Sequence, residues 1–159
     1  MLRALLAVTL LLVGCASQRL VYSNGFSFAN YDFLIVGKPG GENPSTTLYG
    51  MDIEFANVMS RYNMKVIGTK EFADLTPEMQ KRTLFARMSM SAGDKHIQLT
   101  VSFDDAVTNK TVSSITAENR GDIFDTGDRD KVFENATRVI TQALEHEKGL
   151  TVAEAPNRK

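Results

Sequence analysis

Apolar residues along the chain follow two different periods, which together predict a sheet and helices. The continuous apolar run at residues 31–36 is rich in aromatic and β-branched types and predicts a strand buried on both faces. Residues 64–68 predict a second strand. After Leu84 the pattern alternates with period two, which predicts strands at 84–91, 97–103 and 111–118. The two faces of the last strand differ little, so we expect it to form an edge of the sheet.

A helix is predicted at residues 48–62, where apolar residues recur at steps of three and four. These are Leu48, Met51, Phe55, Val58, Met59 and Tyr62. Ser45, Thr46 or Thr47 can cap its start. Gly50 falls inside this predicted helix, where glycine costs about 1 kcal/mol relative to alanine, so we expect another backbone to approach it.

Two further helices are predicted from their start signals and stripes. Thr76, Pro77 and Glu78 form a helix start, which predicts a short helix near residues 77–82. A wide apolar stripe predicts a long helix at residues 130–147. Its members are Val132, Phe133, Ala136, Val139, Ile140, Ala143 and Leu144. Asp128 or Asp130 can cap this helix, and Gly149 ends it.

The order of these elements predicts an α/β fold, an α+β sandwich with one mixed sheet of four to five strands. Strand, helix and strand over residues 31–68 indicate a parallel βαβ unit. The helices at 48–62 and 130–147 would pack on the sheet. We expect a single domain at residues 31–149 and a flexible tail at 150–159.

The first fifteen residues indicate export from the cytoplasm. Arg3 precedes an apolar run at residues 4–13, which is too short for a hydrocarbon core of about 30 Å. Such a segment is typical of a signal peptide. Cys15 is the only cysteine of the chain. An ordinary signal peptide with a chance cysteine is the alternative interpretation.

Residues 12–15, Leu-Val-Gly-Cys, resemble the lipobox of bacterial lipoprotein signal peptides. The resemblance implies cleavage between Gly14 and Cys15, lipidation of the Cys15 thiol, and a lipidated lead-in at residues 15–30. The residue after Cys15 is Ala16. An Asp at that position would resemble the inner-membrane retention signal of enteric bacteria. The resemblance therefore implies a palmitate-bearing lipoprotein on the outer membrane that faces the periplasm.

Charge and cysteine content narrow the possible chemistry. Loss of Arg3 with the signal leaves seventeen basic and nineteen acidic side chains, a net charge of −2. That balance lacks the basic footprint of nucleic-acid binding. With Cys15 lipidated, no thiol remains for a disulfide, a metal site or a nucleophile.

No motif indicates catalysis, a cofactor or a metal. The glycine-rich stretch at residues 37–41 lacks both the P-loop ending and the dinucleotide-binding spacing. His96 and His146, the only histidines, have no paired spacing. The acids Asp122, Asp125, Asp128 and Asp130 lack the glycine and terminal glutamate of an EF-hand, so turn and capping roles are the simpler interpretation. We therefore predict no catalytic residue, no cofactor and no metal site.

The element order also resembles small α/β domains of envelope lipoproteins. The resemblance rests on residues 31–36, on 48–62 running into 64–67, on the turn at 104–110 and on the closing helix. Such domains include the amino-terminal domain of the Tol-system periplasmic protein, the curli-secretion lipoprotein and activators of cell-wall synthases. The resemblance implies binding of proteins, and no functional residue carries over.

Two functions compete at this point. The first is a non-enzymatic adaptor or accessory subunit of an envelope assembly, secretion or cell-wall complex. Its contacts would be the membrane, through lipidated Cys15, and an envelope protein. That protein would pair with the predicted edge strand at Val112 and Ile115 or with the lead-in near Phe26. The second is a lipoprotein that holds a small molecule, lipid or glycan between sheet and helices. The oligomeric state stays open.

Overall fold

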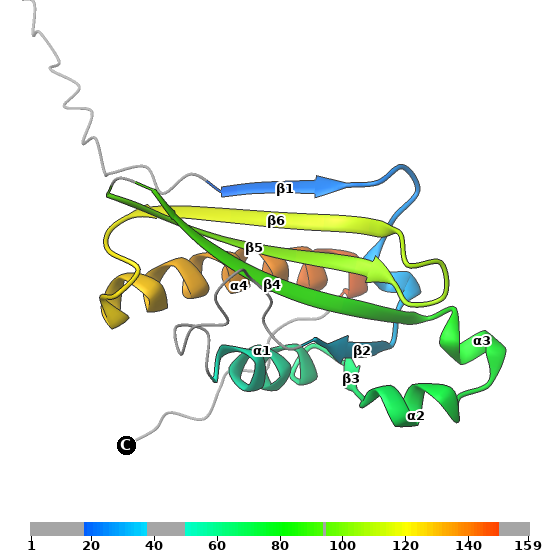
Figure 1. Cartoon of the computed structure of the whole chain (residues 1–159). Coiled ribbons are helices and arrows are strands. Elements are labelled where there is room, and N and C mark those ends of the chain that lie inside the picture. The colour runs from blue at the N-terminus through cyan, green and yellow to red at the C-terminus, as the bar shows by residue number, and fades with distance from the viewer. Residues whose placement is uncertain (1–17, 38–49, 94, 150–159) are drawn as a thin grey trace, which may run out of the picture.

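The computed structural model describes residues 18–37, 50–93 and 95–149, which form one sheet with helices packed on it (Figure 1). The strands are β1 (Gln18–Tyr22), β2 (Phe33–Val36), β3 (Lys65–Val66), β4 (Thr83–Gly93), β5 (His96–Asp105) and β6 (Thr111–Arg120). The helices are the 3-10 helix η1 (Phe28–Asn30) and the α-helices α1 (Met51–Ser60), α2 (Thr69–Ala73), α3 (Pro77–Gln80) and α4 (Thr126–Lys148).

The sheet is mixed, and its six strands run in the order β1-β6-β5-β4-β2-β3. β4, β5 and β6 form an antiparallel meander, whereas β2 lies parallel to both β3 and β4. The predicted α/β class and the parallel βαβ unit are therefore confirmed. The sheet has six strands where four to five were predicted. The additional strand is β1, which lies in the predicted lead-in at residues 15–30.

The main core lies between one face of the sheet and helices α1 and α4. Alternation along the meander directs Leu84 and Met88 of β4 and Leu99 and Phe103 of β5 into this layer, where each is buried. Phe55 of α1 and Ile140 and Leu144 of α4 meet them from the helix side. Full burial of such a side chain is worth about 1.5–3 kcal/mol, so this layer dominates the stability of the domain.

A second, smaller cluster lies on the opposite face beside β2. Phe33, Ile35 and Ile67 are buried there, with Phe72 and Leu75 from the region of α2 packed against them. Burial on both faces of β2 is what its continuous apolar run predicted. The helix α2 was not predicted, because five residues are too few to show a helical stripe.

The ends of two helices differ from the prediction. α4 begins at Thr126, earlier than the predicted residue 130, because Asp125 is its N-cap and accepts a hydrogen bond from the Asp128 backbone amide at 3.1 Å. α1 begins at Met51, and Gly50 is its N-cap with a φ of 90°. That left-handed backbone, and not a close neighbour, is the reason for glycine at this position. The capping candidates at residues 45–47 lie outside the described residues.

The predicted edge strand is an interior strand. β6 pairs with β5 on one side and with β1 on the other, in the register Gln18↔Ala117 to Tyr22↔Ser113. Ile115 is fully buried, and Val112 packs against the core beside a shift in the β5–β6 register. The proposal that Val112 and Ile115 form a free edge for a partner is therefore wrong. The physical reason is a strand almost one hundred residues away in sequence, which local periodicity cannot reveal.

Candidate functional site

The described part of the sheet ends on one side in β1, the strand that leads in from Cys15. β6 occupies one side of β1, and no described strand pairs with the other. Val21 and Tyr22 keep 46% and 39% of their surface exposed. We call Gln18–Tyr22 the attachment edge, since its free backbone groups can recruit another strand and it lies next to the predicted lipidation site.

Behind the attachment edge the chain turns at Gly25 and builds an aromatic corner, defined as Tyr22, Phe26, Phe28 and Tyr31. The ring centroids of Phe26 and Phe28 lie 4.9 Å apart in an edge-to-face arrangement, and those of Tyr22 and Phe26 lie 5.3 Å apart. Phe28 is fully buried and packs edge-to-face on Phe103 of the core at 5.2 Å. Aromatic pairs of this geometry add about 0.5–1.5 kcal/mol beyond burial.

The last turn of α4 holds this corner through Glu147. Its carboxylate accepts hydrogen bonds from the Ser27 hydroxyl at 2.8 Å and from the Phe28 backbone amide at 2.5 Å. A carboxylate is unfavourable at a helix C-terminus, where the helix dipole is negative. The two donors compensate for that cost, so Glu147 serves to fasten η1 to α4.

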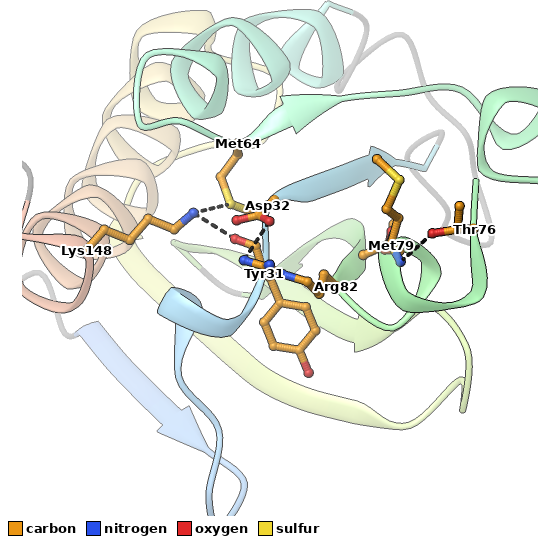
Figure 2. Close-up of polar contacts among 8 residues, drawn as sticks. Tyr31, Asp32, Met64, Thr76, Met79, Arg82 and Lys148 are labelled. Carbon is orange, nitrogen blue, oxygen red and sulfur yellow. Dashed lines mark hydrogen bonds and ion pairs between the residues drawn. The ribbon is translucent and has the colours of Figure 1, made fainter. Parts of the chain in front are cut away.

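Lys148 fastens the next part of the chain, as Figure 2 shows. Its Nζ donates to the Tyr31 carbonyl oxygen at 2.7 Å and contacts the Met64 sulfur at 3.2 Å. Burial lowers the pKa of Lys148, while the nearby Asp32 carboxylate raises it and Arg82 lowers it further. Asp32 itself pairs with Arg82 at 2.6 Å. The chain between the attachment edge and β2 is thus fixed to the domain at several points.

These contacts correct the prediction that residues 15–30 form a lead-in. From Gln18 onward this segment supplies a strand, a buried phenylalanine and a 3-10 helix. Gln18 therefore already belongs to the folded unit, which was predicted to begin at residue 31. Residues 1–17, which include Gly14 and Cys15, lie outside the described residues, as do residues 150–159, so the signal peptide, the lipidation and the tail stay predictions.

A pH titration tests the packing of Tyr22 in this corner. Burial raises the pKa of Tyr22, and hydrogen bonding and charge repulsion from Glu147 raise it further. The pKa of an unfolded tyrosine is about 10. A tyrosine whose pKa is higher in the folded state contributes stability that is fully present below that pH and is lost as the pH rises through the folded-state pKa. We expect Tyr22→Phe to make the free energy of unfolding fall less steeply above about pH 10. Urea unfolding at several pH values measures this difference, and equal slopes in both proteins would contradict it.

The face of the meander opposite α4 carries short polar side chains. Half-buried or exposed Ser and Thr residues line it: Ser89, Ser91, Thr100, Ser102, Ser114 and Thr116. Thr100 and Thr116 share a hydrogen bond across β5 and β6 at 3.4 Å. Near one end, Arg87 pairs with buried Asp104 at 2.5 Å. This face continues from the attachment edge across β6, β5 and β4.

The structure does not bring the other candidate residues together. His96 starts β5, whereas His146 lies in the last turn of α4, toward the other end of the sheet (Figure 1). Within the described ranges no three His, Cys, Asp or Glu side chains are placed to hold a metal ion. Asp122 and Asp125 accept backbone hydrogen bonds in the turn before α4, which agrees with the turn and capping roles predicted for this group of acids. The N-cap, however, is Asp125 and not Asp128 or Asp130 as predicted.

Comparison with known proteins defines a fold and no family. No family model and no curated protein matches the chain. Two crystal structures of PelC from Paraburkholderia phytofirmans, both dodecamers, resemble it with TM-scores of 0.52 and 0.51. Their identities are 14% and 12%, over 82% of this chain and 98% and 97% of theirs. The chain therefore shares the overall fold of the PelC subunit.

A third structure is less similar. Lipoprotein GNA1162 from Neisseria meningitidis aligns with 70% of this chain and 95% of its own, at 15% identity. Its TM-score of 0.45 is too low for an argument about fold or function. Separately, none of the helices in the described ranges is both long and apolar enough to cross a bilayer.

Proposed function

We propose that this chain is an outer-membrane lipoprotein that faces the periplasm and acts as a non-enzymatic adaptor or accessory subunit of an envelope complex. The membrane contact would be the lipid on Cys15. The protein contact would be the attachment edge. In this proposal the partner binds β1, whereas the sequence predicted binding to the strand that became β6.

The observation that carries the proposal is the position of the attachment edge. Gln18 follows Cys15 by three residues and already belongs to the sheet. A fully extended chain of three residues spans at most about 11 Å, so a lipid on Cys15 would hold this edge close to the bilayer surface. A partner strand supplied by a membrane-bound protein would meet the edge there at high effective concentration.

The PelC structures suggest one form that the complex could take. PelC assembles as a dodecamer, and its subunit shares this fold. For this chain, the strand that pairs with the free side of β1 would come either from a second copy or from a different envelope protein.

Site-specific cross-linking tests the proposal. Lipidation would consume the only native thiol, so Val21→Cys in the attachment edge gives the mature protein a single reactive cysteine. We expect a thiol-directed photocross-linker at this position, used in intact membranes, to capture one protein in stoichiometric yield. Purification and mass spectrometry identify it as a second copy or as a different envelope protein.

Val107→Cys is the matched control. Val107 is 48% exposed, close to the 46% of Val21, but lies in the β5–β6 turn, beyond the end of β1 and outside the attachment edge. Capture from Val21→Cys alone would support the proposal. Absence of any cross-linked protein, or equal capture from both positions, would refute the edge as the partner surface.

A further inference from the structure

An exposed phenylalanine lies at the end of the domain from which the chain runs back toward Cys15. Phe124 is 85% exposed, the largest exposure of any large apolar side chain in the described residues. It lies in the loop between β6 and α4. Figure 1 shows this loop, the β4–β5 hairpin and the start of β1 at the same end of the sheet, on the left.

The strand register fixes this placement. Gln18, the first residue of β1, pairs with Ala117 of β6, and Arg120, the last residue of β6, pairs with His96. Arg120 is three residues beyond Ala117, about 10 Å further along the strand. Cys15 is three residues before Gln18, so its reach of about 11 Å extends to the same level. The predicted lipid and Phe124 can therefore meet one bilayer surface together.

The loop holds Phe124 in a defined position. The Phe124 backbone amide donates to Asp122 Oδ1 at 2.9 Å, and Arg129 Nη1 donates to the Ile123 carbonyl oxygen at 3.0 Å. The Asp122 amide donates to Asp128 Oδ2 at 3.2 Å. A side chain added at Gly121 would collide with Asp128, so the loop is closely packed against the first turn of α4. The phenyl ring is thus presented to solvent by an ordered loop.

Charges of both signs are mixed at this end of the domain. Basic side chains come from Arg19, Lys95, Arg120, Arg129 and Lys131, and acidic ones from Asp94, Glu118, Asp122, Asp125, Asp128 and Asp130, so no strongly basic patch is present in this part of the sequence. Asp128 is paired with Lys131 at 3.2 Å, and the other interactions of the loop are hydrogen bonds within it. A membrane contact here would depend on burial of the phenyl ring and not on attraction to anionic lipid.

We propose that Phe124 inserts into the phospholipid interface beside the lipid on Cys15 and so fixes the orientation of the domain on the membrane. This inference rests on the lipid anchor of the proposed function. One side chain binds a bilayer too weakly to act alone, but the anchor keeps it at the surface. The attachment edge would then be held at a set angle for its partner.

A tryptophan probe tests the contact, since the chain contains no tryptophan. The full lipidated protein carrying Phe124→Trp is purified from membranes and reconstituted in phosphatidylcholine vesicles with or without brominated acyl chains. We expect brominated lipid to quench its fluorescence at least two-fold, and equally at low and high salt. Val107→Trp is the control, because Val107 is exposed at the other end of β5, about 30 Å from the loop.

The outcomes separate this inference from the proposed function. Flotation with the vesicles, with quenching of Phe124→Trp and not of Val107→Trp, would support the membrane contact. Flotation with no quenching, or with equal quenching at both positions, would overturn the contact and leave the lipid anchor intact. A protein that carries no lipid and does not float would overturn the anchor and the contact together.

Discussion

Phe28→Ala is expected to lower the free energy of unfolding by about 3–5 kcal/mol, the range for truncation of a buried phenylalanine. Phe28 is fully buried in the core, and its ring centroid lies 5.2 Å from that of Phe103. Its backbone amide also anchors Glu147. The truncation would leave a cavity between η1, β5 and α4, and chemical denaturation measures its cost.

Phe124→Ala is the matched control for this experiment. The same substitution at an 85% exposed position removes no core contact, so we expect a change within about 0.5 kcal/mol. If Phe28→Ala were as mild as Phe124→Ala, residues 18–30 would be a dispensable lead-in and not part of the folded unit. The ratio of the two effects therefore tests the boundary of the domain.

Cys15→Ala is expected to release the protein from the membrane. An ordinary cleavable signal in place of residues 1–14 keeps export intact, so the variant differs from the mature protein only at residue 15. Two or more acyl chains give stable anchoring, whereas burial of one phenylalanine is worth only about 1.5–3 kcal/mol. We expect more than ten-fold less protein in the membrane fraction, with an unchanged unfolding transition.

Ala16→Asp is the control that keeps the lipid. By resemblance to the sorting signal of enteric lipoproteins, this substitution would move the lipidated protein from the outer to the inner membrane. Mass spectrometry of the N-terminal peptide reports the acyl chains, and density fractionation reports the membrane. An unmodified Cys15 in the wild-type protein would contradict the lipoprotein assignment.

The sequence by itself determined the elements whose information is local. Period-two alternation predicted β4, β5 and β6, and burial of Leu84, Met88 and Leu99 on one face confirms it. The apolar stripe predicted α4, and Gly149 ends it in the left-handed conformation with a φ of 63°. Thr76 caps α3, and Pro77 starts it, as predicted. In each case the residues that predict the element lie in the element itself or directly beside it in the sequence.

The tertiary structure alone decided that β1, and not β6, forms this edge of the sheet. β1 is short and mostly exposed, so Gln18–Tyr22 shows little of the alternation that reveals a strand. Its place in the sheet comes from pairing with Ser113–Ala117, a non-local contact that no periodicity records. That pairing made β6 an interior strand and removed Val112 and Ile115 from the candidate site. It also placed the start of β1 at the end of the sheet where the loop that carries Phe124 lies.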